Sequence, residues 1–404
     1  MNKLKKTSME NFKKTKNIYL IMMSLYGFAD KLYGSIYIAF MRSANLSMFQ
    51  ISNLFSIEQI LLAIFDYPTG TISDKIGRKK IASYGFITWG ISLLIFAYSK
   101  HYTYFLISMI LMALGLALIS GAPGAWLVDH MIQDGVYEER TKIFPQIQTI
   151  ISLFAVIASI FSYFFIDVSN SLPIIVAGLI SIFTGFYSYF AGEDNYGNSK
   201  HPSLLKTLNE NLKAFLKDKI MILLTIKKLL SYVSFVVFVL YWQIYVTEII
   251  ELEAKFLPIF LILFMFSLTA GNYLSSKIAN KLENYYVSIV GLIVSAVGFA
   301  LLIIGDNLVT FIIGSILIEV GLGIEQAMTP TWTMEYIKSE VRASYSSIFS
   351  TIQSIFGFFI INLIGFFFEL AGLNIVWLLG IVVIFLEISI VLLFVKKYKS
   401  TRSL

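Results

Sequence analysis

The chain consists mainly of long apolar runs separated by short polar stretches. The runs show no alternation of apolar and polar positions, which argues against the strands of a transmembrane barrel. Runs of about 20 apolar residues are long enough to cross the hydrocarbon core of a membrane as α-helices. The pattern therefore predicts an all-α membrane protein with twelve transmembrane helices. The expected spans are residues 17–40, 48–72, 79–99, 102–128, 142–166, 171–191, 221–247, 256–278, 285–304, 307–334, 342–370 and 372–395.

The composition supports a membrane protein and narrows its chemistry. Hydrophobic residues make up 57% of the chain and charged residues 14%, whereas soluble domains carry about 25% charged residues. The sequence contains no cysteine, which excludes disulfides and cysteine-based metal sites. It also contains no nucleophile elbow, zinc-protease motif or nucleotide-binding loop. We therefore expect no enzyme activity, no cofactor and no metal.

The positive charges are distributed unevenly between the loops. The net charge is +6, and most of the 31 lysines and arginines fall in every second loop and in the two tails. Cytoplasmic loops carry such an excess, so the distribution predicts a multi-pass protein of the cell membrane with both termini in the cytoplasm. Basic residues in these positions contact anionic lipid, and no nucleic-acid partner is expected. The first apolar run lacks a small-residue cleavage site and is expected to be retained.

The longest polar stretch divides the chain into two halves. We expect an N-terminal six-helix bundle at residues 1–191, a cytoplasmic linker at 192–219 and a C-terminal six-helix bundle at 220–404. Within the linker, residues 204–217 have the pattern of an amphipathic helix that lies on the membrane surface. A solvated connector explains this segment better than a site for a regulatory partner.

The two halves repeat short motifs at nearly one sequence offset, which predicts two pseudo-symmetric bundles. The corresponding positions are Gly70 and Asp74 with Gly271 and Ser275, then Pro123, Trp126 and Asp129 with Pro330, Trp332 and Glu335, and finally Arg140 with Arg342.

The loop between the second and third spans carries the most specific motif. It reads Gly-x-x-x-Asp-Lys-x-Gly-Arg-Lys over residues 70–79. Gly70 would let two helices approach closely, Asp74 is placed to cap or ion-pair with a helix end, and Gly77 permits a tight turn. This order of residues resembles the signature loop of the major facilitator superfamily of secondary transporters.

The resemblance implies both a fold and a conformational gate. Major facilitator transporters consist of two six-helix bundles that rock around a central site, and we expect a monomer. In the family, the loop aspartate meets the start of the eleventh helix. A loop arginine pairs with an acid at the end of the fourth helix, and these contacts lock the outward-open state. The resemblance thus predicts Asp74 near the helix that begins around Arg342, and an ion pair between Arg78 and Asp129.

Charged residues inside the spans are candidates for function, because each costs ~2.5–3.5 kcal/mol on insertion scales. They are Asp30, Lys31, Glu58, Glu319, Glu325 and Glu387. In the family the first, fourth, seventh and tenth helices line the cavity, so the resemblance favours Asp30, Glu319 and Glu325 as proton- or substrate-binding carboxylates. A carboxylate that has lost its water can hold a proton near neutral pH.

The positions of these charges separate them further. Glu319 and Glu325 lie six residues apart, about 240° around a helix, so only one is expected to face the cavity squarely. We expect Lys31 to form a buried pair with Glu58 on the neighbouring span. Glu387 is expected to be structural, because twelfth helices are usually peripheral.

A polar interruption of the seventh span, Trp242 and Gln243, is expected to contact a partly apolar ligand. Together these features predict a proton-coupled antiporter that exports a small amphipathic compound, similar to bacterial drug-efflux members of the family. The fourth span contains no arginine, and the fifth span contains no glycine or proline after Pro145, unlike typical drug–proton antiporters. A nutrient importer or facilitator, for a sugar, peptide or organic anion, and a membrane sensor without turnover remain alternatives.

Overall fold

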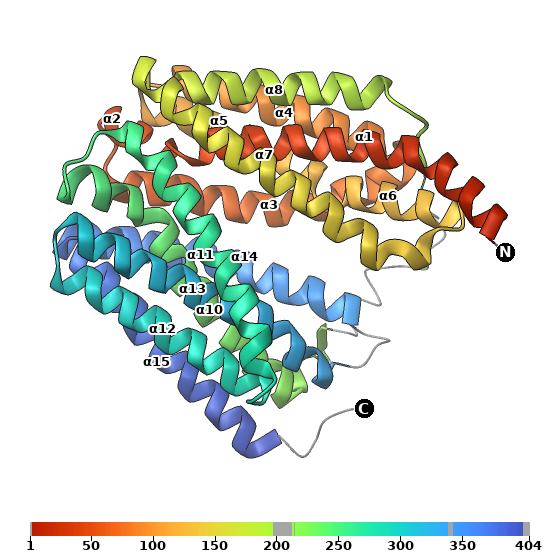
Figure 1. Ribbon diagram of the computed structural model, residues 1–404. Helices are drawn as coiled ribbons and strands as arrows, with labels where there is room; N and C mark the ends of the chain where they lie inside the picture. Colours follow the sequence, from red (N-terminus) through yellow and green to blue (C-terminus); the bar gives the residue numbers. More distant parts are fainter. Residues whose placement is uncertain (1, 197–211, 214, 338–341, 399–404) are drawn as a thin grey trace. The chain divides into compact units, whose positions relative to one another are not determined.

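The computed structural model describes residues 2–196, 212–213, 215–337 and 342–398 (Figure 1). All regular structure in these ranges is helical. In the first half the helices are α1 (Asn2–Gly34), α2 (Tyr37–Ser43), α3 (Met48–Ile76), α4 (Arg78–Tyr98), α5 (Tyr102–Ile119), α6 (Ala122–Gln133), α7 (Arg140–Val168) and α8 (Leu172–Phe190). In the second half they are α10 (Lys219–Ile244), α11 (Leu257–Ala279), α12 (Asn284–Ile304), α13 (Leu308–Thr333), α14 (Arg342–Ala371) and α15 (Leu373–Tyr398).

Within the described ranges, 11 helical segments are long and apolar enough to cross a membrane. The segment missing from this set is the first expected span, which contains Asp30 and Lys31. It consists of α1 and α2, which are separated at Ser35 and Ile36. With this broken helix included, the order of spans is the one expected for the twelve-helix fold.

The fourth expected span is also broken, which the apolar pattern did not predict. α5 ends at Ile119, and α6 begins at Ala122 after Gly121, whose φ is 72°. Glycine adopts this left-handed conformation without a steric penalty. Pro123 then lies in the first turn of α6, where its missing N–H leaves no hydrogen bond unmade.

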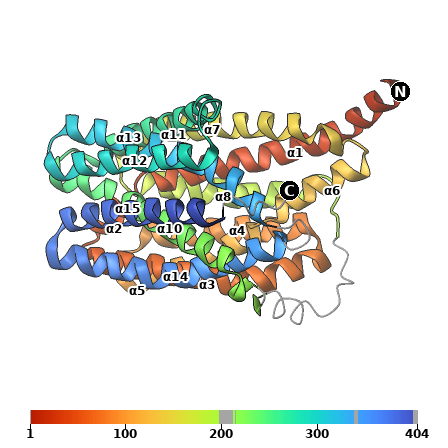
Figure 2. The ribbon, with the colours of Figure 1, turned by 90° about the horizontal axis from the view of Figure 1, so that it is seen from below.

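The chain divides into two compact units. The N-terminal unit contains residues 1–46, 57–201 and 254–259, and the C-terminal unit contains residues 47–56, 202–253 and 260–404. The start of α3 is therefore grouped with the second half, and the start of α11 with the first half. The amphipathic helix expected near residues 204–217 lies largely outside the described residues. Figure 2 follows the same chain from a second direction.

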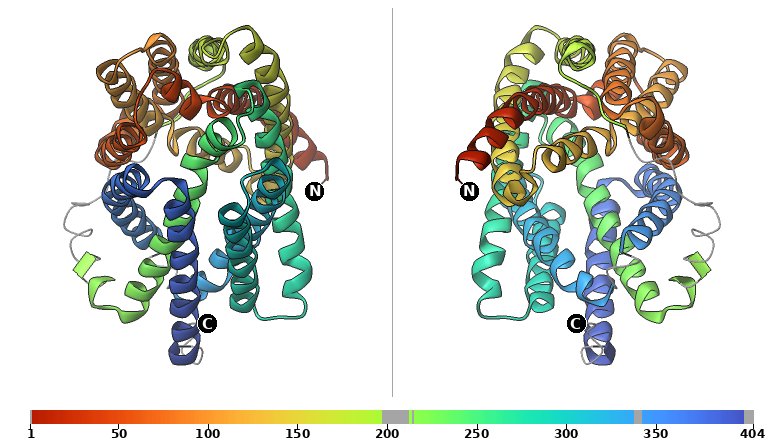
Figure 3. Two further views of the ribbon diagram at one scale, coloured as in Figure 1. Left: turned by 90° about the vertical axis from the view of Figure 1, so that its left-hand side faces the viewer. Right: turned by 90° about the vertical axis from the view of Figure 1, so that its right-hand side faces the viewer.

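In the N-terminal unit, α4 lies against both α5 and α8. The close approach depends on small residues: a Cβ atom at Gly90 would lie 2.6 Å from the carbonyl oxygen of Gly178 on α8. Hydroxyl groups join the same two helices, as between the Oγ atoms of Ser83 and Ser188, 2.8 Å apart. Close backbone packing and interhelical hydrogen bonds are the usual means of helix association in membranes. Figure 3 views several helices of this unit nearly along their axes.

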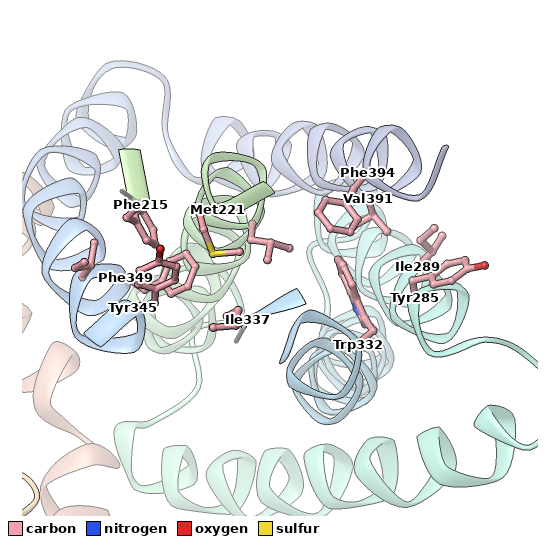
Figure 4. Close-up of a cluster of buried hydrophobic side chains, with 12 residues drawn as sticks. Phe215, Met221, Tyr285, Ile289, Trp332, Ile337, Tyr345, Phe349, Val391 and Phe394 are labelled. Carbon is pink, nitrogen blue, oxygen red and sulfur yellow. The ribbon is translucent and has the colours of Figure 1, made fainter. Parts of the chain in front are cut away.

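In the C-terminal unit, α12 takes the corresponding central place and packs against α13 and α15. A Cβ atom at Gly298 would lie 2.5 Å from the carbonyl oxygen of Gly314 on α13. This unit also contains a cluster of buried apolar side chains, shown in Figure 4. Its buried members are Phe215, Met221, Leu224, Tyr285, Ile289, Trp332, Ile337, Tyr345, Ile348, Phe349, Val391 and Phe394.

Candidate functional site

An ion-pair network lies at the loop end of the N-terminal unit. Arg78, the first residue of α4, donates from Nη1 to Oδ2 of Asp129 on α6 at 2.5 Å, and from Nε to Oδ1 of Asp74 on α3 at 3.2 Å. One guanidinium group therefore joins three helices. The Arg78–Asp129 ion pair that the resemblance implied is present. Its role in gating stays a prediction.

The turn before α4 depends on Gly77 and on a distant carboxylate. Gly77 has a φ of 119°, and a Cβ atom there would collide with the carboxylate of Asp194. That carboxylate accepts from the backbone N–H groups of Lys79 at 2.9 Å and Lys80 at 3.1 Å. It thus caps the N-terminus of α4, where an acceptor and a negative charge are both favourable. The sequence predicted the turn at Gly77 but assigned Asp194 to the linker.

Lys79 makes the reciprocal contact with the end of α8. Its buried ammonium group donates to the carbonyl oxygens of Tyr189, Ala191 and Gly192 at 3.1, 2.7 and 3.1 Å. A cation here satisfies the last carbonyl groups of a helix. Lys79 and Asp194 therefore fasten the start of α4 to the end of α8, and we call these two residues the α4–α8 clasp.

The segment that follows α8 is held by backbone contacts as well. Asn195 accepts from the backbone N–H of Arg78 at 3.1 Å, and its side-chain amide donates to the carbonyl oxygen of Trp126 at 3.0 Å. The Trp126 indole donates in turn to the carbonyl oxygen of Glu193 at 3.1 Å. Residues 193–195 therefore belong to the N-terminal unit, which corrects their assignment to the linker.

Gly70 and Arg342 are the two remaining members of the predicted gate, and the structure describes the surroundings of the first but not the side chain of the second. Gly70 makes no close helix contact: within its own unit, no described atom lies within 4 Å of a Cβ atom placed there. The expected close approach at this glycine is therefore wrong for the N-terminal unit. Arg342 begins α14, but its side chain lies outside the described residues, and the contact of Asp74 with α14 stays a prediction.

The intramembrane charges of the N-terminal unit pair differently from the prediction. Lys31 donates to Oδ2 of the adjacent Asp30 at 2.8 Å, and the expected pair with Glu58 is wrong. The Asp30 and Lys31 side chains are 41% and 33% exposed. Glu58, on α3, is buried.

Three tyrosines, Tyr26, Tyr33 and Tyr37, lie within electrostatic range of Asp30 and Glu58. The rings of Tyr33 and Tyr37 lie 5.2 Å apart. We call Tyr26, Asp30, Lys31, Tyr33, Tyr37 and Glu58 the tyrosine–carboxylate cluster. It contains two acids and one base, and the sequence had placed Lys31 together with Glu58.

A second charged cluster is buried inside the C-terminal unit. Lys227 of α10 donates to Glu325 of α13, to Oε1 of Glu387 on α15, 3.1 Å away, and to the hydroxyl group of Thr329 at 2.6 Å. The Ser231 hydroxyl group lies 3.3 Å from the ammonium group and donates to Oε1 of Glu387 at 2.7 Å. We call these five residues the lysine–glutamate cluster.

The lysine–glutamate cluster shows which partners several of the predicted charged residues have. Glu325 pairs within its own unit, whereas Glu319 is partly exposed and forms no ion pair among the described residues. Glu387, expected to be a structural charge, belongs to the cluster. Lys227, which falls within the expected span 221–247, is fully buried. Lys227 lies two helical turns inside α10, and the twelfth span contains an acid without an assigned partner. These two facts together could have identified Lys227 as a buried partner of Glu387.

Trp242 and Gln243 are packing residues in this structure. The Trp242 ring meets the ring of Phe264 on α11 edge to face, with centroids 5.0 Å apart. The Gln243 side chain is 0% exposed. Both side chains lie in the interior of the C-terminal unit, and their contact with a ligand stays a prediction.

A cavity of about 160 Å³ adjoins the lysine–glutamate cluster. Lys227 and Thr329 form part of its wall, while most of the remaining lining is apolar. Phe349 and Ile337, both labelled in Figure 4, belong to the same wall. The other lining residues are Leu224, Lys228, Pro330, Thr333, Met334 and Ser346.

Two helical units with helices of membrane-spanning length, charged clusters inside the spans and an ion-pair network at one loop end are typical of a multi-pass membrane protein. The sequence profile described as Major Facilitator Superfamily matches residues 19–361. The chain therefore belongs to this superfamily of transporters, as the signature loop predicted.

The curated relatives carry the same family name. The chain is 24% identical over 243 residues to the uncharacterized MFS-type transporter YxaM of Bacillus subtilis (strain 168), a match covering 58% of this chain and 59% of the relative. It is 27% identical over 137 residues to the uncharacterized MFS-type transporter MJ1317 of Methanocaldococcus jannaschii, covering 34% of this chain and 33% of the relative. The chain thus matches little more than half of the first relative and a third of the second.

Solved structures show the same fold. A crystal structure of the nucleoside transporter NupG has a TM-score of 0.76 and 13% identity, covering 95% of this chain and 99% of that one. The inward-facing, occupied structure of a bacterial homologue of the human lysosomal transporter Spinster also has a TM-score of 0.76, with 12% identity and coverage of 96% and 97%. At these identities the likeness establishes the fold alone.

Proposed function

We propose that this protein is a secondary transporter of the cell membrane that exports a small amphipathic compound in exchange for protons by alternating access. Membership of the superfamily supports transport, and the lysine and arginine distribution supports cytoplasmic termini. The observation that carries the mechanism is the Arg78 network, in which one guanidinium group holds α3, α4 and α6 together at the loop end.

The Arg78 network has the strength that a gate requires. The Arg78, Asp74 and Asp129 side chains are 17%, 38% and 36% exposed, so water competes for each contact. Partly exposed ion pairs contribute up to about 1 kcal/mol. Such contacts can bias one state over another and still break in every transport cycle. In this proposal Asp74 leaves Arg78 in one state and meets the start of α14 near Arg342.

The tyrosine–carboxylate cluster favours an amphipathic cation as the substrate. Its three aromatic rings offer apolar contact and cation–π attraction, and its two carboxylates exceed its single lysine by one negative charge. A small number of polar groups among aromatic side chains is typical of sites that orient a small molecule. Asp30 is the proposed substrate carboxylate here. Glu319 remains the proposed exchanging carboxylate of α13.

Proteoliposomes test the proposal directly, with ethidium as a planar aromatic cation. We expect counterflow of ethidium and its accumulation against a gradient when a pH gradient is imposed. We expect Asp30→Asn and Glu319→Gln to lower pH-driven accumulation at least tenfold, while Glu138→Gln, at a side chain that is 85% exposed, leaves it unchanged. A sensor would give no flux, and a facilitator would give flux that ignores the pH gradient. Either result would overturn the proposal.

A further inference from the structure

The charges of the lysine–glutamate cluster do not balance. The Lys227, Glu325 and Glu387 side chains are 2%, 7% and 0% exposed, so water contributes almost nothing to their stabilisation. Two ionised carboxylates and one ammonium group would leave one negative charge buried. An uncompensated charge in such a place is strongly unfavourable, and a proton on one carboxylate removes it.

The hydrogen bonds identify which carboxylate has room for the proton. Oε1 of Glu387 accepts from Ser231 and Lys227, whereas Oε2 of Glu387 is buried and has no hydrogen-bond partner among the described residues. Glu325 is engaged more fully, since its Oε1 accepts from Lys227 and, at 2.5 Å, from Thr329. A protonated Glu387 would keep both contacts of Oε1 and carry its hydrogen on Oε2.

No further charge in the described neighbourhood compensates the cluster. α15 packs against α10, α12 and α14. Besides Lys227, α10 contributes Lys228, whose ammonium group lies over the ring of Phe349, and Lys219 at its first residue. α12 carries no charged side chain, and its titratable Tyr285 lies in the apolar cluster with Tyr345 of α14. In the described part of α14 the charged residue is Glu369, which accepts from the backbone N–H of Phe49.

The cluster suits a proton better than a metal ion. Lys227 already occupies the position between the two carboxylates, and a second cation a few ångströms away would be repelled in this low-dielectric interior. Nor do the described residues contain a group of three or more histidine, cysteine, aspartate or glutamate side chains that could hold a metal.

A cavity and a chain of hydroxyl groups lie beside the cluster. The cavity of about 160 Å³ has Lys227 and Thr329 in its wall, and it is large enough for several water molecules beside polar partners. The Thr329 hydroxyl group bonds to both Lys227 and Glu325 and lies 3.3 Å from the hydroxyl group of Ser288. A proton in the cavity therefore reaches the cluster through a short chain of hydrogen-bonding groups.

We propose that the lysine–glutamate cluster is a proton-binding site of the C-terminal unit and that Oε2 of Glu387 takes up the exchangeable proton. Binding converts the Glu387 carboxylate into a neutral carboxylic acid, and no other bond is made or broken. The deprotonated Glu387 holds Lys227 by an ion pair, whereas the protonated form accepts from Lys227 only as a neutral carbonyl oxygen. The proton thereby sets how firmly α15 is tied to α10. The use of this proton to drive transport rests on the proposed function, but the binding of the proton to Glu387 does not.

Infrared difference spectroscopy of the purified protein between acidic and alkaline pH tests the site without any substrate. We expect a band of a protonated carboxylic acid that titrates in the wild type, is lost in Glu387→Gln and persists in Glu369→Gln, the same change at an exposed carboxylate. The proposal would be overturned if the wild type showed no titrating band, or if Glu387→Gln kept every band of the wild type. If Glu387→Gln fails to fold, Glu387→Asp should displace the midpoint, and an unchanged midpoint would overturn it equally.

Transport measurements separate this site from the proposed function. In proteoliposomes we expect Glu387→Gln to keep ethidium counterflow and to lose accumulation driven by a pH gradient. Full pH-driven accumulation in this variant would exclude the site as the coupling proton carrier. A titrating Glu387 band in a protein without any flux would refute the transport proposal and leave the proton site standing.

Discussion

Two charged networks of this protein, one in each unit, lie in opposite environments. The Arg78 network of the N-terminal unit lies at the ends of helices and is partly exposed, whereas the lysine–glutamate cluster of the C-terminal unit lies between helices and is almost fully buried. Water can replace the partners of Arg78 when its contacts break. It cannot replace those of Lys227, so separating that cluster would leave buried charges unpaired. The first network is suited to opening, and the second to taking up a proton while it stays together.

Residues at equivalent positions of the internal repeat also make different contacts in the two units. Trp126 donates a hydrogen bond to the carbonyl oxygen of Glu193, while Trp332 packs on Phe394 with ring centroids 5.4 Å apart (Figure 4). Gly70 has open space within its unit, but a Cβ atom at Gly271 would collide with the carbonyl oxygen of Val320. The repeat therefore preserves the fold while single positions acquire different roles.

The largest expected effect comes from breaking the buried network. Lys227→Met leaves two carboxylates without their cation, and removing one partner of a buried pair costs about 3–5 kcal/mol. We expect a large loss of thermal stability, or of folded protein, in size-exclusion chromatography monitored by fluorescence. Adding Glu325→Gln should restore part of the loss. Lys228→Met, at the neighbouring and less buried lysine, is the control, and equal stability of the two single variants would contradict the comparison.

Gly77→Ala should have the next largest effect. It combines a left-handed backbone with a collision against Asp194, and a strained backbone of this kind costs on the order of 1–3 kcal/mol. Thermal unfolding of the purified variant measures it. Gly70→Ala is the matched substitution in open space and should leave the unfolding temperature nearly unchanged. If the two alanines were equivalent, the packing described for Gly77 would be wrong.

The α4–α8 clasp is testable by a smaller change. Asp194→Ala removes the carboxylate that caps α4, and loss of such a cap costs about 1 kcal/mol. Glu193→Ala serves as the control, because the described contact of Glu193 with Trp126 uses its backbone carbonyl group. We expect a lower unfolding temperature for the first variant alone. A similar decrease in both would show that the segment, and not the cap, matters.

Asp129→Asn should have the smallest effect on stability and a clear effect on function. Its partly exposed contact with Arg78 contributes up to about 1 kcal/mol, so the unfolding temperature should barely change. The rate of ethidium counterflow should change several-fold, because the ion pair biases one state of the cycle. Asp134→Asn, at the end of the same helix, should change neither. An unaltered rate in Asp129→Asn would remove the Arg78 network from the gate.

The sequence predicted which segments span the membrane better than it predicted which charged side chains pair with each other. The resemblance to the family implied Arg78 and Asp129 as partners, because the family pairs a loop arginine with an acid at the end of the fourth helix. No such rule links Lys227 to Glu387, which lie on the first and last helices of their half, or Lys79 to the end of α8. Lys31 and Glu58 were paired by depth alone. The depth of a residue in the membrane does not show that Lys31, which is partly exposed, pairs with the adjacent Asp30.

The apolar runs, the lysine distribution and one loop motif were enough, without coordinates, to determine the twelve-helix fold and the transporter superfamily, because membrane thickness and backbone hydrogen bonding leave few alternatives. Only the tertiary structure decided which buried charges meet, where α1 and α5 end, and that Asp194 caps α4. Those outcomes depend on contacts between residues far apart in the chain, and local sequence patterns carry no distance information between helices.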